Sequence, residues 1–241
     1  MPRLLERQTA LLAYLTSPAA IFGNGRGRAD ARLAGVDRGR LHLEARFSHD
    51  KRMEKIRGVL PKTFALLGPR LGRVLRDFAA ACPPTDIGRL HNARQFHDFL
   101  RRRWTRLSSR RPYLPDVAAC ELAMSEARSF AEDEPAPPIS TPSGSPGRIR
   151  RRPGVVLVRC RHDVRPVFED SAARVARRQV FLAVAVPFGA DRPAVAELAP
   201  PVFRLLAGLG APHKRTALGG TAAAEALIDA LTAEGLVELC P

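Results

Sequence analysis

The sequence predicts an α+β protein with an N-terminal all-helical bundle and a small C-terminal winged-helix-like α+β domain. Two observations lead to this class: apolar residues recur at helical spacing in the first half, and β-branched runs of strand length occur only in the second half. With 241 residues, 45% of them hydrophobic, the chain can build two cores. We expect a helical domain over residues 1–130, a linker over 131–153 and a second domain over 154–241.

Five or six helices are expected before the linker. Each is predicted from apolar residues at helical spacing, and two of them end at prolines, at Ser17-Pro18 and Pro83-Pro84. Pro115 is expected to open the last helix, because the missing N–H of a proline has no partner in a first turn. The expected helices cover residues 4–15, 41–60, 71–78 and 87–104, with the last one running from Pro115 to Phe130.

The linker is predicted from composition alone. Residues 131–153 contain six Pro, three Ser and two Gly, and they end in a basic cluster. They show no apolar periodicity that could be buried, which is typical of a connection between domains.

After the linker, strands and helices are both expected. Runs rich in β-branched residues predict strands, while apolar stripes at i, i+3, i+4 and i+7 predict helices. Pro200 is expected to begin one helix, Thr221 to cap the next, and Gly235 to end it in the left-handed conformation. The expected strands cover 155–160, 179–187, 194–198 and 236–240, and the expected helices cover 200–209 and 221–234.

Composition excludes several classes of protein. No apolar run approaches the roughly 18–20 residues that cross a bilayer, so no membrane partner is expected. The first 18 residues lack the ordered charge, apolar run and cleavage residues of a signal peptide. The four cysteines lie 38 or more residues apart, which excludes paired zinc-ribbon motifs and a dense disulfide framework. We expect reduced thiols in a cytoplasmic protein.

The charge of +15 predicts attraction to nucleic acid or to acidic proteins and peptides, without choosing between them. Arg101 to Arg103, followed by Trp104, could clamp a phosphate backbone, but a solvated basic face around a buried Trp is the favoured interpretation. The helix after Thr221 does not read DNA, because no Lys or Arg occurs from residue 216 to the end. Nucleic acid is therefore the disfavoured partner.

No catalytic, cofactor-binding or metal-binding residue is assigned. The GxSxG, HExxH and P-loop motifs are missing from the sequence. His42 and His49 lie seven residues apart, about 10 Å along a helix, which is too far for one metal ion. Cys160, His162 and Asp163 have ligand chemistry but no evident fourth ligand, so packing at a strand end is the favoured interpretation.

The strand at 179–187 is apolar on both faces, with Val180, Leu182 and Val184 on one of them. This pattern is typical of a central strand. The alternative is an edge strand beside an apolar helix, which would bind a guest peptide by β-augmentation. On that alternative the candidate peptide-binding residues are Val180, Leu182 and Val184, with Leu227 and Leu231 on the helix.

Three stretches of the first domain resemble a known helical module. They are LPKTFALLGPRLGRVLRDFAAACPP (60–84), FHDFL (96–100) and PYLPDVAACELAMSEA (112–127). The module was once labelled a DNA-binding domain, and it is found in partner proteins of multinuclear iron oxygenases, such as the methanobactin biosynthesis pair. Over roughly residues 40–130, the chain is similar to this partner-protein family.

The resemblance implies a non-catalytic accessory subunit. Its partners would be a multinuclear iron oxygenase, which supplies the iron ligands, and a ribosomally made Cys-containing precursor peptide whose leader the second domain engages. No cofactor is expected in this chain. The candidate docking residues are Arg103, Trp104, Tyr113 and Leu114. Asp116 is expected to lie near a helix N-terminus, where the helix dipole stabilises its carboxylate, and it is not expected to act in catalysis. The alternatives are a DNA-binding regulator and, more weakly, a free-standing enzyme.

Overall fold

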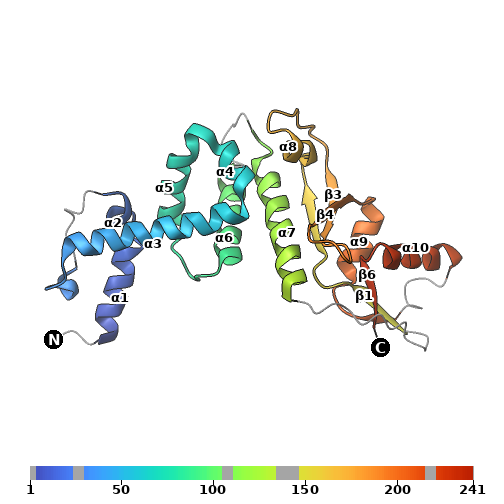
Figure 1. The fold of residues 1–241 in the computed structure, drawn as a ribbon, viewed down its shortest axis with the longest axis horizontal. Helices are drawn as coiled ribbons and strands as arrows, with labels where there is room; N and C mark the ends of the chain where they lie inside the picture. Colours follow the sequence, from blue (N-terminus) through green and yellow to red (C-terminus); the bar gives the residue numbers. More distant parts are fainter. Residues whose placement is uncertain (1–3, 24–29, 105–110, 134–146, 215–220, 241) are drawn as a thin grey trace. The chain divides into compact units, whose positions relative to one another are not determined.

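The computed structural model describes residues 4–23, 30–104, 111–133, 147–214 and 221–240. Its contacts divide the chain into two units, Met1–Ala118 and Ala119–Pro241, and the division falls inside helix α7 (Leu114–Asp133) (Figure 1). The fold class is α+β, with a helical N-terminal region and two small antiparallel sheets. The range expected as a linker overlaps the end of α7 and a strand at Arg148–Arg151, and residues 134–146 lie outside the described residues.

Every helix that the apolar stripes predicted before residue 131 is present, together with shorter ones. Residues 4–15, 38–59, 71–81 and 89–104 are helical, and Pro115 stands in the first turn of α7, as expected. Ser17 does more than mark the end of a helix, because its hydroxyl accepts a hydrogen bond from the Ala20 amide and caps a further helix. The elements are α1 (Leu4–Leu15), α2 (Pro18–Phe22), η1 (Ala31–Leu33), α3 (Arg38–Val59), α4 (Pro61–Leu67), η2 (Gly68–Arg70), α5 (Leu71–Ala81), α6 (Arg89–Trp104) and the start of α7.

Aromatic rings from three helices form the core of this unit. Phe64 of α4 and Phe78 of α5 both contact Phe96 of α6, with ring centroids 5.4 and 5.0 Å apart. Phe78 and Phe96 are completely buried, and each such ring contributes about 2–3 kcal/mol through the surface it removes from water. The aromatic residues that made this region resemble a known module are therefore packing residues.

The second unit contains the expected strands at 156–160, 180–185, 194–197 and 237–240. The strand at 148–151 and the two-residue strand at 213–214 were not predicted. Their residues are mostly polar and show no alternation of apolar and polar side chains, so only their pairing with other strands identifies them. The short helix at 165–169 was also not predicted. The elements are β1 (Arg148–Arg151), β2 (Val156–Cys160), α8 (Arg165–Glu169), β3 (Val180–Ala185), β4 (Ala194–Glu197), α9 (Pro200–Gly208), β5 (His213–Lys214), α10 (Ala222–Ala233) and β6 (Val237–Cys240).

The helix boundaries in this unit follow the signals in the sequence. Pro200 occupies the first turn of α9. The Thr221 hydroxyl accepts a hydrogen bond from the Ala224 amide at 3.2 Å and caps α10. Gly235 has φ of +67°, in the left-handed region that favours glycine. These three predictions are confirmed.

Two sheets, ordered β5-β1-β6 and β2-β3-β4, share one core with α9 and α10. The β2-β3-β4 sheet is covered on both faces. Phe181 of β3 meets Phe203 of α9 at 4.9 Å on one face, and Cys160 of β2 meets Cys120 of α7 on the other. β3 is therefore buried on both sides. Within the described residues, no helix has the length and apolar character needed to cross a membrane.

Candidate functional site

Strand β4 forms an edge of the β2-β3-β4 sheet, and in the described part of the chain it pairs with β3 alone. The amide of Leu198 donates to the carbonyl of Phe181 at 2.7 Å, which sets the alternation of the antiparallel ladder. Ala196 therefore bonds to β3, whereas Val195 and Glu197 direct their backbone N–H and C=O groups away from it. No other strand of the described residues pairs with these groups.

The side chains of β4 leave room for a second strand. Ala194 and Ala196 are small and exposed, and Val195 is half-buried. Pro193 precedes the strand and Pro200 follows it, which keeps the edge short, as edge strands of monomeric proteins commonly are. A guest strand could thus form backbone hydrogen bonds to Val195 and Glu197, each of which offers one donor and one acceptor.

Four charged residues close a ring at the end of β4. Arg165 binds Asp163 at 2.7 Å and Glu197 at 2.6 Å. Arg178 binds the same two carboxylates at 2.6 and 2.5 Å. Hydrogen bonds from Arg165, and then from Arg178, hold the pKa of Asp163 well below its usual range. Two cations balance two anions in this ring. Its members come from the segment after β2, from α8, from the segment before β3 and from β4, so the ring ties the edge strand to the rest of the sheet.

The residues predicted to bind a peptide along β3 lie in the core. β3 pairs with both β2 and β4, and the side chains of Val180, Leu182 and Val184 are 1%, 0% and 0% exposed. The central-strand interpretation is confirmed, and these side chains do not form a peptide-binding surface, because α7 and α9 cover the two faces of the sheet. On α10, Leu231 is buried in the same core, while Leu227 is 36% exposed.

The residues predicted to dock a partner are divided between core and surface. Trp104 is buried, and its indole N–H donates to the carbonyl of Arg111 at 2.8 Å. Leu114 is completely buried, and Tyr113 is half-buried. Arg103 forms an ion pair with Asp77 and keeps 30% of its side chain exposed. Trp104 and Leu114 therefore stabilise the first unit and are not available for docking, whereas Arg103 and Tyr113 remain partly accessible.

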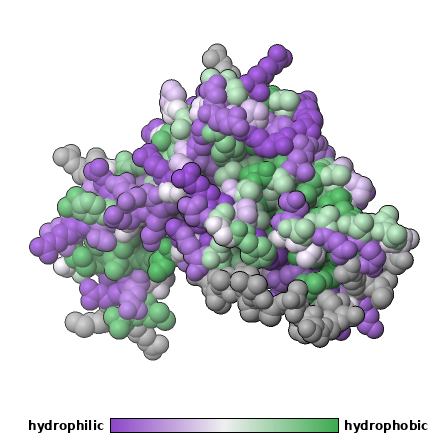
Figure 2. Space-filling view, turned by 45° about the vertical axis from the view of Figure 1, so that its right-hand side comes forward, coloured by the Kyte–Doolittle hydropathy of each residue, from purple (hydrophilic) through white to green (hydrophobic). Residues whose placement is uncertain are grey.

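Two exposed apolar patches were not recognised from the sequence. On α1, Leu5 and Leu12 lie two turns apart and are 73% and 62% exposed. On α3, Leu43 and Phe47 lie one turn apart and are 51% and 63% exposed. In Figure 2, hydrophobic residues reach the surface in several areas separated by hydrophilic ones. Periodicity could have indicated these positions, but only burial distinguishes an exposed stripe from a packed one.

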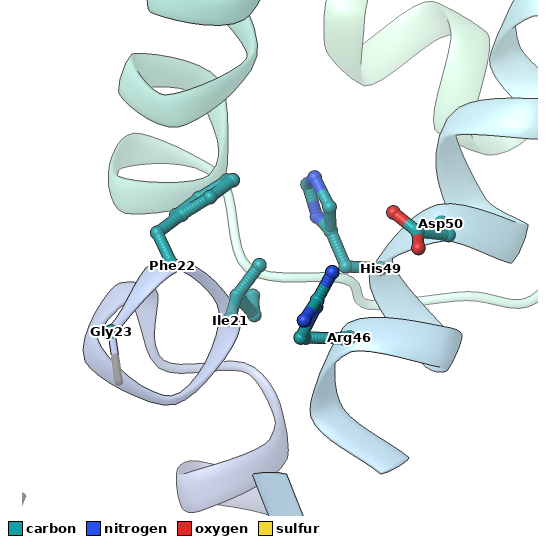
Figure 3. A pocket seen from close by; sticks show the side chains of 6 residues that line it. All are labelled: Ile21, Phe22, Gly23, Arg46, His49 and Asp50. Atoms are coloured by element: carbon teal, nitrogen blue, oxygen red, sulfur yellow. The ribbon is translucent and has the colours of Figure 1, made fainter. Parts of the chain in front are cut away.

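A hollow of about 360 Å³ lies between α2 and α3. Phe22 and His49 face each other across it, with ring centroids 5.1 Å apart and nearly perpendicular planes (Figure 3). Burial lowers the pKa of His49, so its imidazole is neutral at pH 7. Arg46 and Asp50 also line the hollow. The spacing of histidines gave no indication of this arrangement, because its apolar wall comes from a helix that was not predicted.

The histidines, cysteine and aspartate that were considered as metal ligands do not form a metal centre within the described residues. The Nδ1 atom of His42 lies 2.7 Å from the carbonyl oxygen of Ala20, while His49 faces Phe22. Cys160 is directed toward Cys120, and Asp163 is engaged by arginines. The interpretation of Cys160 as a packing residue at a strand end agrees with its complete burial.

No family model matches this chain, and no curated protein matches it. The functional proposal accordingly depends on the motifs in the sequence and on the geometry described above.

Proposed function

We propose that this chain is a non-catalytic accessory subunit, in the manner of the partner proteins of multinuclear iron oxygenases that its first unit resembles. It binds an iron-dependent, peptide-modifying oxygenase and presents a ribosomally made precursor peptide whose cysteines are modified. The observation that carries the proposal is the open edge of β4, where Val195 and Glu197 offer backbone groups to an extended peptide.

Backbone pairing suits a leader peptide, because main-chain hydrogen bonds supply affinity while the side chains of alternate residues supply specificity. The ion-pair ring around Glu197 supports this use, since it holds the edge strand without leaving an unbalanced charge at its end. The net charge of +15 adds a general attraction for acidic peptide segments.

Docking on the oxygenase is assigned to the first unit. The motif residues Phe96, Leu100 and Leu114 are buried, so they specify the fold of the module and leave contact with a partner to its surface. The exposed leucines of α1 are apolar groups that an interface core would cover.

The experiment combines co-purification with peptide titration. Co-expressed with a multinuclear iron oxygenase, the chain is expected to co-elute with that enzyme. Leu12→Glu should weaken this association, whereas Ala13→Glu, an exposed change about 100° around the same helix, should weaken it much less. If the two chains never co-elute, the proposal fails.

Peptide binding is measured by fluorescence anisotropy with a labelled, Cys-containing precursor peptide. Val195→Pro removes the outward N–H without breaking the ladder and is expected to weaken binding by about tenfold or more. Val195→Ile keeps the N–H and should change affinity by less than about twofold. Equal affinity of the two variants would exclude the β4 edge as the binding site.

The alternative, a DNA-binding regulator, is favoured by one observation: Arg101 and Arg102 are exposed in the last turn of α6. Salt dependence separates the two functions. A DNA complex should weaken steeply as salt is raised, because bound counterions are released, whereas docking on the oxygenase through apolar residues should respond much less.

A further inference from the structure

Two buried cysteines of the second unit lie side by side. The sulfur atoms of Cys120, on α7, and Cys160, on β2, are 3.7 Å apart. Their residues are 1% and 0% exposed, and neither takes part in a disulfide. A disulfide needs sulfurs about 2.05 Å apart, so a shift of less than about 2 Å in side-chain atoms would bring these two into bonding distance.

The backbones that carry the two thiols are held together at a second point. Phe130, ten residues after Cys120 on α7, packs on Gly154, six residues before Cys160 in the turn that leads into β2. Helix and strand therefore run antiparallel to each other over this length. The helix and the strand are therefore held together at both ends of this length, by the two cysteines at one end and by Phe130 and Gly154 at the other.

The other two cysteines provide an internal comparison. Cys82 ends α5 in the first unit, where its carbonyl accepts a hydrogen bond from Arg52, and Cys240 ends β6. Within the described residues of the second unit, Cys240 has no sulfur contact like the one that joins Cys120 and Cys160. Within the second unit, Cys120 and Cys160 are therefore the pair that the fold brings together.

We propose that Cys120 and Cys160 are oxidised reversibly to an intramolecular disulfide. The oxidant is a small-molecule disulfide, such as oxidised glutathione, which reacts with the two thiols by thiol–disulfide exchange. One cysteine, as its thiolate, attacks the glutathione disulfide, forms a mixed disulfide and releases one glutathione thiolate. The second cysteine then attacks the protein sulfur of the mixed disulfide and releases the second glutathione. Two protein thiols are oxidised, one glutathione disulfide is reduced to two thiols, and protons are conserved overall.

Burial sets the rate of this exchange. A disulfide reagent reaches the sulfurs only when α7 separates transiently from β2, so oxidation should be slow in the native chain and faster when this contact is weakened. The product joins residues 40 apart and ties α7 covalently to the sheet.

The test uses the full chain, reduced and then incubated with oxidised glutathione. Remaining thiols are alkylated in denaturant, and the intact mass and disulfide-linked fragments are determined. We expect loss of two of the four thiols, a single Cys120–Cys160 linkage, and reversal by reduced glutathione. The oxidised chain should show a midpoint of thermal unfolding raised by about 5–10 °C over the reduced chain.

The control chain carries Cys82→Ser and Cys240→Ser, and it should still lose both remaining thiols. Cys160→Ala should abolish the intramolecular linkage, and its circular dichroism spectrum checks the fold. The wild-type result decides the proposal even if that variant is unstable. Retention of all four thiols, persistent mixed disulfides, or linkages spread over other cysteine pairs would overturn it. None of these readouts depends on an oxygenase or a precursor peptide.

Discussion

The aromatic ring of Phe130 lies against the backbone of Gly154, so closely that a Cβ atom at Gly154 would be 2.7 Å from Cδ1 of Phe130. Gly154 also has φ of +78°, a conformation that residues with a side chain rarely adopt. Steric contact and backbone conformation therefore both require glycine at this turn into β2.

Gly154→Ala is expected to lower the free energy of unfolding by about 1–3 kcal/mol, measured by urea denaturation followed by circular dichroism. The matched control is Gly208→Ala in α9, where a Cβ would meet nothing within 4 Å. There the change should be neutral or stabilising, by up to about 1 kcal/mol, because alanine favours a helix over glycine. Comparable destabilisation by both variants would contradict the contact with Phe130.

The substitution Arg52→Met in α3 should also destabilise the first unit. The buried guanidinium donates to Oδ1 of Asn92 at 2.8 Å, to Oε1 of Gln95 at 2.6 Å and to the carbonyl of Cys82 at 2.8 Å. Burial lowers the pKa of Arg52 to about 10, so the side chain remains charged at pH 7.

Removing the guanidinium takes one hydrogen-bond donor from each of these acceptors, and we expect a loss of about 2–3 kcal/mol in urea denaturation. Arg38→Met, an exposed change on the same helix, should alter stability by less than about 0.5 kcal/mol. A wild-type midpoint for the Arg52 variant would mean that the network contributes no net stability.

Stability should fall as the solution is made mildly acidic. Burial lowers the pKa of His49 and of His97, with Arg52 adding to the effect at His49 and Asp50 opposing it. The unfolded chain, with its ordinary histidine pKa of about 6.5, then binds protons first as the pH falls. The stability contributed by neutral histidine is complete above that pH and is lost progressively below it.

Urea midpoints measured at pH 7.5 and pH 5 should therefore differ, with the lower midpoint at pH 5. His49→Gln is expected to reduce the difference, whereas His213→Gln, at an exposed position in β5, should leave it unchanged. An unchanged difference in the His49 variant would show that its imidazole is protonated equally in the folded and unfolded states.

Local signals in the sequence determined the α+β class, the long helices and most of the strands. Stop and start residues such as Pro83, Thr221 and Gly235 act on their own few neighbours, so their effect can be recognised without knowing the fold. The same holds for the two apolar faces of β3, which indicated a buried strand before any partner was known.

Tertiary structure alone decided which strands lie at an edge and which side chains meet. β1 exists because it pairs with β6, although its sequence, Arg-Ile-Arg-Arg, has no strand pattern beyond one buried isoleucine. The approach of Cys120 to Cys160 joins residues 40 apart. Such contacts depend on where whole elements pack. The pattern of apolar and polar residues along one element shows which face is buried, but it does not identify the element that packs against that face.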